Sequence, residues 1–217
     1  MTERSRPPHP VRRSPLPRRR NRRGEGDLLR TEILQAAERL LRTSGDEDAV
    51  SIRAIASEVG VTPPSIYIHF RDKTELILAV CEELFRRLGE LSDEAVAGVE
   101  DPYERVERRG RAYVQFGIDN PEPYRIMFMA RPDAGHARMT ADELLDTAAF
   151  GHLQMDLTAA MEMGRIPHGD PFTMSCGLWA AVHGVTSLLI AKPDFPWPPM
   201  DAFIDASAGW RPATGSG

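Results

Sequence analysis

Hydrophobic residues recur at helical spacing along almost the whole chain from residue 27 onward. The first stripe runs through Leu29, Ile33 and Leu40. Asp27 can cap its start, and Gly45 follows its end. No stretch alternates between apolar and polar residues for long enough to predict a strand. The pattern therefore predicts an all-α protein whose first helix has about four turns and one buried face.

Residues 51–70, SIRAIASEVGVTPPSIYIHF, predict two short helices joined by a tight turn. Ser51 can cap the first helix, and Gly60 supplies the left-handed residue that ends it. Thr62 can cap the second helix, whose opening prolines lack N–H groups that the first turn does not need. Ile66 anchors that helix inward. The segment is interpreted as a helix-turn-helix.

A longer helix is predicted to begin after Asp72. Asp72 and Glu75 have the D-x-x-E spacing of a capping box. Lys73 then lies in the first turn, where the helix dipole disfavours a cation unless an anion such as a DNA phosphate is near. A solvated lysine is the alternative interpretation.

The segment around these features resembles the DNA-binding domain of the tetracycline-repressor (TetR) family. Between residues 31 and 80 it carries the run G-V-(S/T)-x-x-x-(I/L)-Y-x-H-F-x-x-K as Gly60, Val61, Thr62, Ile66, Tyr67, His69, Phe70 and Lys73. The resemblance implies a three-helix domain whose recognition helix, residues 62–69, enters the major groove. The DNA-binding residues that it implies are Arg53, Thr62, Ser65, Tyr67, His69 and Lys73.

A Pro-Pro pair at 63–64 departs from the family pattern. It removes two backbone donors and two polar side chains from the helix end nearest the bases. Base recognition then depends on Thr62, Ser65 and Tyr67, and Ile68 can contact a thymine methyl group. The alternatives are that Tyr67 is an amphipathic surface residue and that His69 is a charge partner of the helix C-terminus, and the joint pattern disfavours both.

The rest of the chain predicts a second helical domain, interrupted by proline and glycine residues. A capping box at Thr140 and Glu143 precedes one of its helices. The predicted helices are Tyr103–Ile118, Glu122–Ala130, Asp142–Met163, Phe172–Ala191 and Asp201–Trp210.

Two segments of this domain resemble a large TetR subgroup with a Trp-x-x-x-His-Gly run in its C-terminal domain. They are NPEPYRIMF at 120–128 and LWAAVHGVTSLL at 178–189. Trp179 and His183 lie on one helix face, four residues apart. Three interpretations of His183 stay open: a hydrogen-bonded core residue, a hydrogen-bond partner of a ligand and, least favoured, a metal ligand.

Methionine is concentrated in the second domain, where seven of the nine methionines lie between residues 127 and 174. Methionine suits both adaptable binding surfaces and ordinary cores. We predict a pocket there for a small, mainly apolar ligand, with Tyr113 and His183 as polar contacts. The predicted ligand-binding residues are Tyr113, Phe116, Met127, Phe150, Met155, Met161, Trp179 and His183.

Charge divides the chain unevenly. Residues 1–23 hold nine arginines and one acid, a net charge of +8, whereas the whole chain carries −5 and the remainder therefore −13. Such a proline- and arginine-rich arm is predicted to be disordered, and it either binds nucleic acid or is a solvated tail. We assign a disordered basic arm to 1–24, a helix-turn-helix domain to 25–72, a helical regulatory and dimerisation domain to 73–211 and a flexible tail to 212–217.

Several classes of protein are disfavoured. Cys81 and Cys176 lie 95 positions apart without a CxxC pattern, which argues against a disulfide scaffold, a zinc module and an iron–sulfur site. No nucleotide-binding loop occurs. The longest nearly apolar stretch, 177–191, has 15 residues, too few to cross a bilayer. We expect no catalytic residues, no metal, no cofactor and no membrane contact, and a cytoplasmic location.

Together with these patterns, the family resemblance implies a transcription regulator, a repressor that leaves its double-stranded DNA operator when a small apolar effector binds. The family resemblance implies a homodimer joined by 172–191 and 201–210 of both copies, and hence an operator with dyad symmetry. One alternative is a ligand-independent DNA-binding protein. Another is a small-molecule-binding helical protein with a vestigial helix-turn-helix.

Overall fold

The computed structural model describes residues 25–45, 50–128, 145 and 147–209. Within these ranges every regular element is a helix, as the hydrophobic spacing predicts. The helices are α1 (Glu25–Ser44), α2 (Ile52–Val59), α3 (Pro63–Tyr67), α4 (Lys73–Ala95), α5 (Pro102–Asp119), α6 (Pro121–Phe128), α8 (Ala148–Glu162), α9 (Pro171–Ala191) and α10 (Met200–Ala208). The basic arm (1–24) and the tail (212–217) lie outside the described residues, so both assignments stay predictions.

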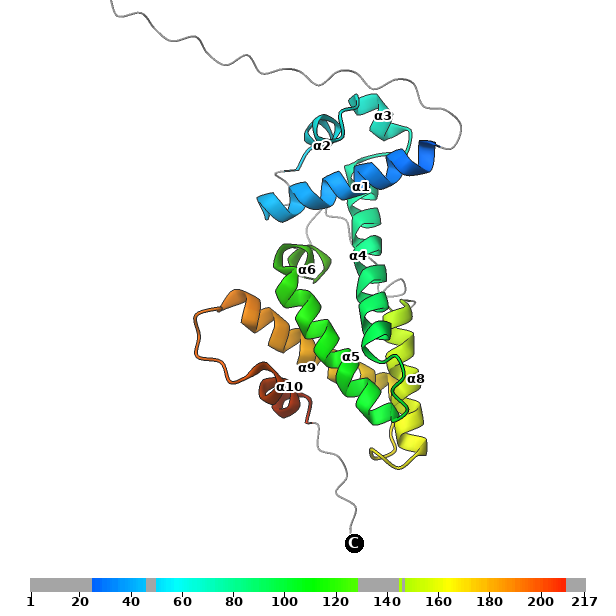
Figure 1. The fold of residues 1–217 in the computed structure, drawn as a ribbon, viewed down its shortest axis with the longest axis vertical. Helices are drawn as coiled ribbons and strands as arrows, with labels where there is room; N and C mark the ends of the chain where they lie inside the picture. Colours follow the sequence, from blue (N-terminus) through cyan, green and yellow to red (C-terminus); the bar gives the residue numbers. More distant parts are fainter. Residues whose placement is uncertain (1–24, 46–49, 129–144, 146, 210–217) are drawn as a thin grey trace, which may run out of the picture.

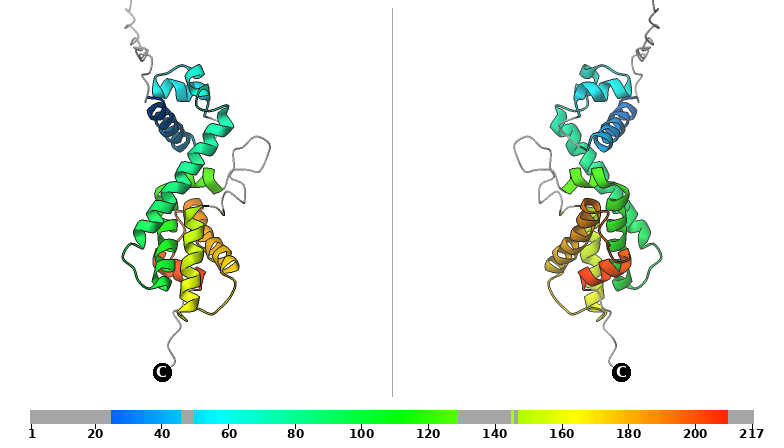
Figure 2. Two further views of the ribbon diagram at one scale, coloured as in Figure 1. Left: turned by 90° about the vertical axis from the view of Figure 1, so that its right-hand side faces the viewer. Right: turned by 90° about the vertical axis from the view of Figure 1, so that its left-hand side faces the viewer.

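The helices form two lobes joined by α4 (Figure 1). The small lobe holds α1, α2 and α3. In the large lobe α5 and α8 pack against the far half of α4, and α9 and α10 pack beyond them. Figure 2 shows a waist between the lobes, and the short helix α6 lies there, in contact with α1, α4 and α5.

The small lobe forms around the local signals that the sequence predicts. The Ser51 hydroxyl accepts a hydrogen bond from the Ala54 N–H at 3.2 Å, and Gly60 ends α2 with a φ of 78°. Ile66 of α3 is fully buried. The core of this lobe continues along α4 to Leu84 and takes in Ile126 of α6, so it extends beyond the assigned boundary at residue 72.

The large lobe depends on close contact between α5 and α9. A Cβ atom on Gly117 of α5 would overlap the Thr186 methyl group of α9, so only glycine permits this crossing. Its buried residues form two separate clusters. One includes Val114 and Ile204, and the other includes Val106.

Most of the predicted helices of the second domain agree with the structure to within a few residues, as far as the described ranges allow. The continuous helix predicted over 142–163 is wrong. Thr147 has an extended backbone with a ψ of 138° and forms the N-cap of α8, which begins one residue later. A threonine favours such a cap over a helix interior. The predicted capping pair Thr140 and Glu143 lies outside the described residues.

Helix α9 is more apolar than the other helices that the structure describes. It has 21 residues, more than the 15 of the apolar stretch 177–191, because the helix begins before Gly177. By length and composition it could therefore cross a membrane. It packs against α5, α8 and α10 as part of the bundle. Only 22% of its most apolar stretch is buried, so one apolar face of α9 is left uncovered by the residues that the structure describes.

Candidate DNA-binding surface and ligand pocket

The predicted DNA-binding residues lie on α2, on and beside α3 and in the first turn of α4, and none is buried. The exposed ones are Arg53, Thr62 and Tyr67, and the half-buried ones are Ser65, His69 and Lys73. Tyr67 is 53% exposed and the neighbouring Ile68 is 81% exposed. Large apolar side chains this exposed contribute little to the core, so they are available to a partner.

Helix α3 is shorter than the predicted recognition helix 62–69. Its helical residues are 63–67, and Thr62 is an extended N-cap without a side-chain bond to the backbone. The prolines leave the Thr62 hydroxyl few N–H partners, and it instead lies 3.1 Å from the Ser65 hydroxyl. The two hydroxyl groups predicted to contact bases therefore form one polar pair.

The start of α4 is held by a modified capping box. Asp72 accepts a hydrogen bond from the Glu75 N–H at 2.8 Å, as predicted. The reciprocal bond differs, because the Glu75 carboxylate accepts from the Arg71 N–H at 2.6 Å. The Glu75 N–H and the Arg71 side chain hold the pKa of Asp72 below its ordinary value. The box fixes the start of the helix on which Lys73 is the first residue.

The large lobe contains a pocket of about 710 Å³, its open mouth included. Helices α4, α5, α8 and α9 supply most of the walls, and α6 adds one side chain. Most of the lining is apolar or aromatic. The lining residues are Phe85, Leu88, Ser92, Val106, Arg109, Gly110, Tyr113, Phe128, Thr147, Ala149, Phe150, Leu153, Leu178, Trp179 and Val182.

The pocket includes Tyr113, Phe150 and Trp179 from the predicted ligand-binding set. The other predicted residues, Phe116, Met127, Met155, Met161 and His183, are not among its lining residues. Helical phase accounts for this on α8: Leu153 faces the pocket, and a residue two positions later points about 200° away. Met155 is accordingly 69% exposed. A ligand-binding role for any of the eight stays a prediction.

A chain of hydrogen bonds runs from the pocket wall to His183. The Trp179 indole N–H donates to the Tyr113 hydroxyl at 3.2 Å, and the Tyr113 and Tyr124 hydroxyls lie 3.2 Å apart. His183 Nδ1 lies 2.6 Å from the Tyr124 hydroxyl. Burial raises the pKa of Tyr113 and lowers that of His183. Neutral His183 thus has partners within the protein, as in the core-residue interpretation.

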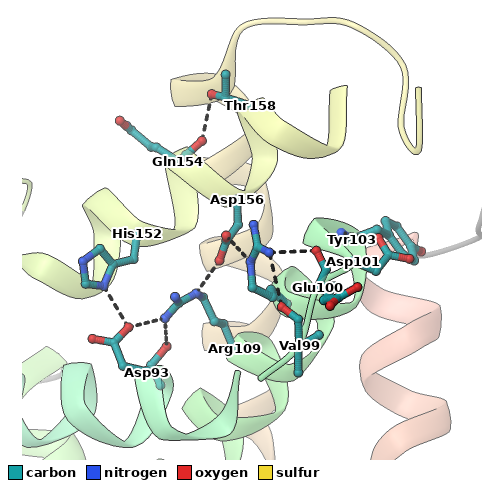
Figure 3. A network of polar contacts seen from close by, with 12 residues as sticks. Asp93, Val99, Glu100, Asp101, Tyr103, Arg109, His152, Gln154, Asp156 and Thr158 are labelled. Atoms are coloured by element: carbon teal, nitrogen blue, oxygen red, sulfur yellow. Dashed lines mark hydrogen bonds and ion pairs between the residues drawn. The ribbon is translucent and has the colours of Figure 1, made fainter. Parts of the chain in front are cut away.

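A second polar network lies at the Ser92 and Arg109 end of the pocket (Figure 3). Asp156 of α8 accepts hydrogen bonds from Arg105 at 2.6 Å and from Arg109 at 2.7 Å, both on α5. Arg109 also donates to Asp93 of α4 at 2.7 Å and to Ser92 at 3.0 Å. Partial burial opposes the charge on Asp93, but the hydrogen bonds from Arg109 and His152 hold the Asp93 pKa below its ordinary value.

Arg109 is not among the ligand-binding residues that the sequence predicts. A local signal for it exists, because Arg109 follows Val106 by three positions and precedes Tyr113 by four, which places it on the apolar face of α5. An arginine on such a face needs buried acidic partners, and those lie on other helices.

Helix α6 connects the pocket to the small lobe. Phe128, its last residue, lines the pocket and packs edge-on against Phe85 with ring centroids 5.2 Å apart. Ile126 of the same helix is buried in the core of the small lobe. Arg42 at the end of α1 also donates a hydrogen bond to Asn120, just before α6. Helix α6 therefore contacts both the pocket wall and α1.

Within the described part of the chain, no three His, Cys, Asp or Glu side chains are grouped so that they could hold a metal ion. Cys81 is buried and Cys176 is partly buried, and no disulfide joins the two.

Two family models match the chain. The model for bacterial regulatory proteins of the tetR family matches residues 33–80, which include the helix-turn-helix. The model for the tetracyclin repressor-like C-terminal domain matches residues 106–209, which include most of the pocket walls.

Individual proteins show the same likeness. The HTH-type transcriptional regulator BetI of Brucella anthropi is 37% identical over 83 residues, 38% of this chain, so the chain matches only 42% of the length of BetI. A protein of unknown function from Rhodococcus sp. RHA1 has a solved structure with a TM-score of 0.70 and 27% identity, covering 83% of this chain and 92% of its own.

The fold is also that of FadR from Bacillus subtilis, solved in complex with stearoyl-CoA, with a TM-score of 0.67 at 12% identity over 82% of this chain and 95% of FadR. The family models match both lobes of the structure, one on the helix-turn-helix and the other on the helical bundle. The chain belongs to the tetR family of bacterial regulatory proteins.

Proposed function

We propose that the protein is a DNA-binding transcription regulator of the cytoplasm, a repressor that leaves a dyad-symmetric operator when a small apolar effector enters the pocket. The observation that carries the proposal is the position of α6, with Phe128 in the pocket wall and Ile126 in the core of the DNA-binding lobe. A ligand that favours one arrangement of α6 changes the position of α1, and DNA and ligand then weaken each other by the same factor.

The exposed face of the small lobe supports DNA binding. Tyr67 and Lys73 are proposed to contact phosphates, and the Thr62–Ser65 hydroxyl pair is proposed to contact bases. The pocket counts against a ligand-independent protein, since a purely structural bundle needs no such space. FadR, which has the same fold, was solved in complex with stearoyl-CoA, a ligand with a long apolar acyl chain.

A second copy of the chain is the proposed cover for the apolar face of α9. Gly177, Ala180 and Leu188 are exposed there, and the Cβ position of Gly184 has open space around it. These residues recur every three or four positions, the spacing of a helix–helix seam, and the small ones permit close approach.

The DNA-binding proposal is tested by selecting duplexes from a random pool with the full chain and measuring the affinity of variants for the selected site. Lys73→Ala should weaken binding to all sequences alike and lower the salt dependence by about one counterion. Lys192→Ala, which removes the other lysine of the chain, is the matched control and should have no effect. Ser65→Ala should change the preferred sequence. Unaltered binding by Lys73→Ala and Ser65→Ala contradicts the assignment.

The dimer is tested by sedimentation at micromolar concentration. Leu188→Glu places a charge on the uncovered face of α9 and should yield monomers. Leu91→Glu on α4 is a matched control, because Leu91 and Leu188 are both 45% exposed. A dimer that survives the Leu188 change lies elsewhere on the protein.

A further inference from the structure

The pocket has one polar end, and its chemistry limits the kind of ligand. Five aromatic rings and six aliphatic side chains make up most of the rest of the lining, and the rings belong to Phe85, Tyr113, Phe128, Phe150 and Trp179. Rings of this kind favour flat, aromatic molecules by offset or edge-on packing. Arg109, at the polar end, is the charged residue among the lining side chains that the structure describes.

The charge of Arg109 is already balanced. Asp156 accepts from its Nε, and Asp93 accepts from its Nη1, both at 2.7 Å. Arg105 supplies the second positive charge of the network through its 2.6 Å bond to Asp156. Two arginines and two aspartates sum to zero when His152 is neutral. A carboxylate ligand would therefore meet two carboxylates beside the guanidinium, and an ammonium ligand would meet the guanidinium itself.

Arg109 nevertheless keeps hydrogen-bonding capacity. Its Nη2 has no hydrogen-bond partner among the described residues. The fully buried side-chain polar atoms without a partner do not include Nη2. The side chain is 10% exposed and lines the pocket, so this nitrogen can donate to a bound molecule. An uncharged oxygen acceptor satisfies Nη2 without disturbing the charge balance.

We propose that the pocket selects an uncharged aromatic ligand with one oxygen acceptor directed at Arg109, and that it discriminates against carboxylates and amines of the same shape. This inference rests on the proposed role of the pocket as the effector site. It adds a rule of charge selection to that role.

The test uses three probes of one shape: naphthamide, naphthoate and naphthylmethylammonium. Their binding to the full chain is measured by calorimetry at pH 8. Naphthamide should bind about tenfold or more tightly than either ion, because each ion loses hydration without gaining a net opposite charge. Naphthoate binding as tightly as naphthamide overturns the charge rule and leaves the pocket as an effector site. If none of the three probes binds, both the charge rule and the role of the pocket as an effector site are overturned. DNA selection on the same preparation still tests whether the protein is a DNA-binding regulator.

A variant shifts the balance without emptying the pocket. Asp93→Asn removes one negative charge from a side chain that is 45% exposed, so the fold should tolerate it. The ratio of naphthoate to naphthamide affinity should then rise about tenfold, since the network carries a net positive charge. Asp194→Asn, on the loop after α9, makes the same change in total charge away from the pocket and should leave the ratio unaltered. A ratio that stays the same in Asp93→Asn shows that charge balance does not set the selectivity.

Discussion

The two lobes bury their apolar side chains in different ways. The small lobe has one continuous core, in which Ile33, Ile55 and Leu76 are fully buried. The large lobe has two smaller clusters and an open pocket. A dense core holds one arrangement, whereas side chains around a void lack contacts on one side and can shift at lower cost. The small lobe therefore holds its core side chains in one arrangement, whereas the side chains around the pocket of the large lobe can rearrange at lower cost.

Two groups of ion pairs, one from each lobe, differ in burial. The small-lobe pair Arg39–Glu58 lies at the surface, with side chains 56% and 42% exposed. In the large lobe Asp156 is only 8% exposed and bridges Arg105 and Arg109. Exposed pairs contribute little to stability, but a buried charge that loses its partner is costly. The Asp156 network is therefore expected to contribute more to stability than the Arg39–Glu58 pair does.

The largest expected effect is on that buried network. Asp156→Asn should lower the free energy of unfolding by about 3–5 kcal/mol, because it leaves two arginines without their shared carboxylate. Glu58→Gln, which breaks the exposed pair, should cost about 0–1 kcal/mol. Urea unfolding of both variants at pH 7 measures the difference. Equal costs would remove the contrast between the lobes.

The next largest difference in stability is expected when a large apolar side chain is truncated in each lobe. Leu76→Ala in the dense core should cost about 3 kcal/mol through lost burial and a new cavity. Leu153→Ala in the pocket wall should cost clearly less, since Leu153 is only partly buried and already borders open space. The same unfolding measurement tests this pair, and a larger loss for Leu153 would mean that the pocket is tightly closed in solution.

The helix-turn-helix could be predicted from sequence because its signals act over a few residues. The Ser51 cap, the Gly60 turn and the Asp72 cap each work within one turn of chain, and all three stand in the structure. The exposed positions of Arg53 and Tyr67 followed from the same pattern. Their contacts with DNA stay predictions.

The pocket could be predicted only as a kind of site, since its walls come from distant segments. Arg109 and Asp156 are 47 positions apart, and Tyr113 and His183 are 70 apart. Helical periodicity identifies an apolar face but not which neighbouring helix covers it. Met155 illustrates the limit. Methionine is a residue type that suits an apolar pocket, but the position of Met155 around the axis of α8 directs its side chain to solvent.

A smaller effect should appear in the pH dependence of stability. Burial lowers the pKa of folded His183, so the unfolded chain takes up a proton at higher pH than the folded chain does. Stability is therefore lost as pH falls through the ordinary histidine range, about 6.5. His183→Gln keeps a hydrogen-bond acceptor without titrating, so its unfolding free energy should fall less than that of the wild type between pH 7 and pH 5. Parallel losses would show that His183 is not the group responsible.

The smallest expected effect concerns Ile68 in the small lobe. This side chain is 81% exposed beside the proposed base-contacting hydroxyls, where it can cover a thymine methyl group. Replacing that thymine with uracil in the selected duplex should weaken binding by about 0.8 kcal/mol, the value of one buried methyl-sized group. The Ile68→Ala variant should bind the thymine and uracil duplexes with equal affinity. The Tyr67→Phe variant should bind both duplexes more weakly by the same factor, because it loses a phosphate contact. If every single thymine of the site can be replaced by uracil without loss, Ile68 does not contact a thymine methyl group, and the specificity of the small lobe comes from its hydroxyl pair.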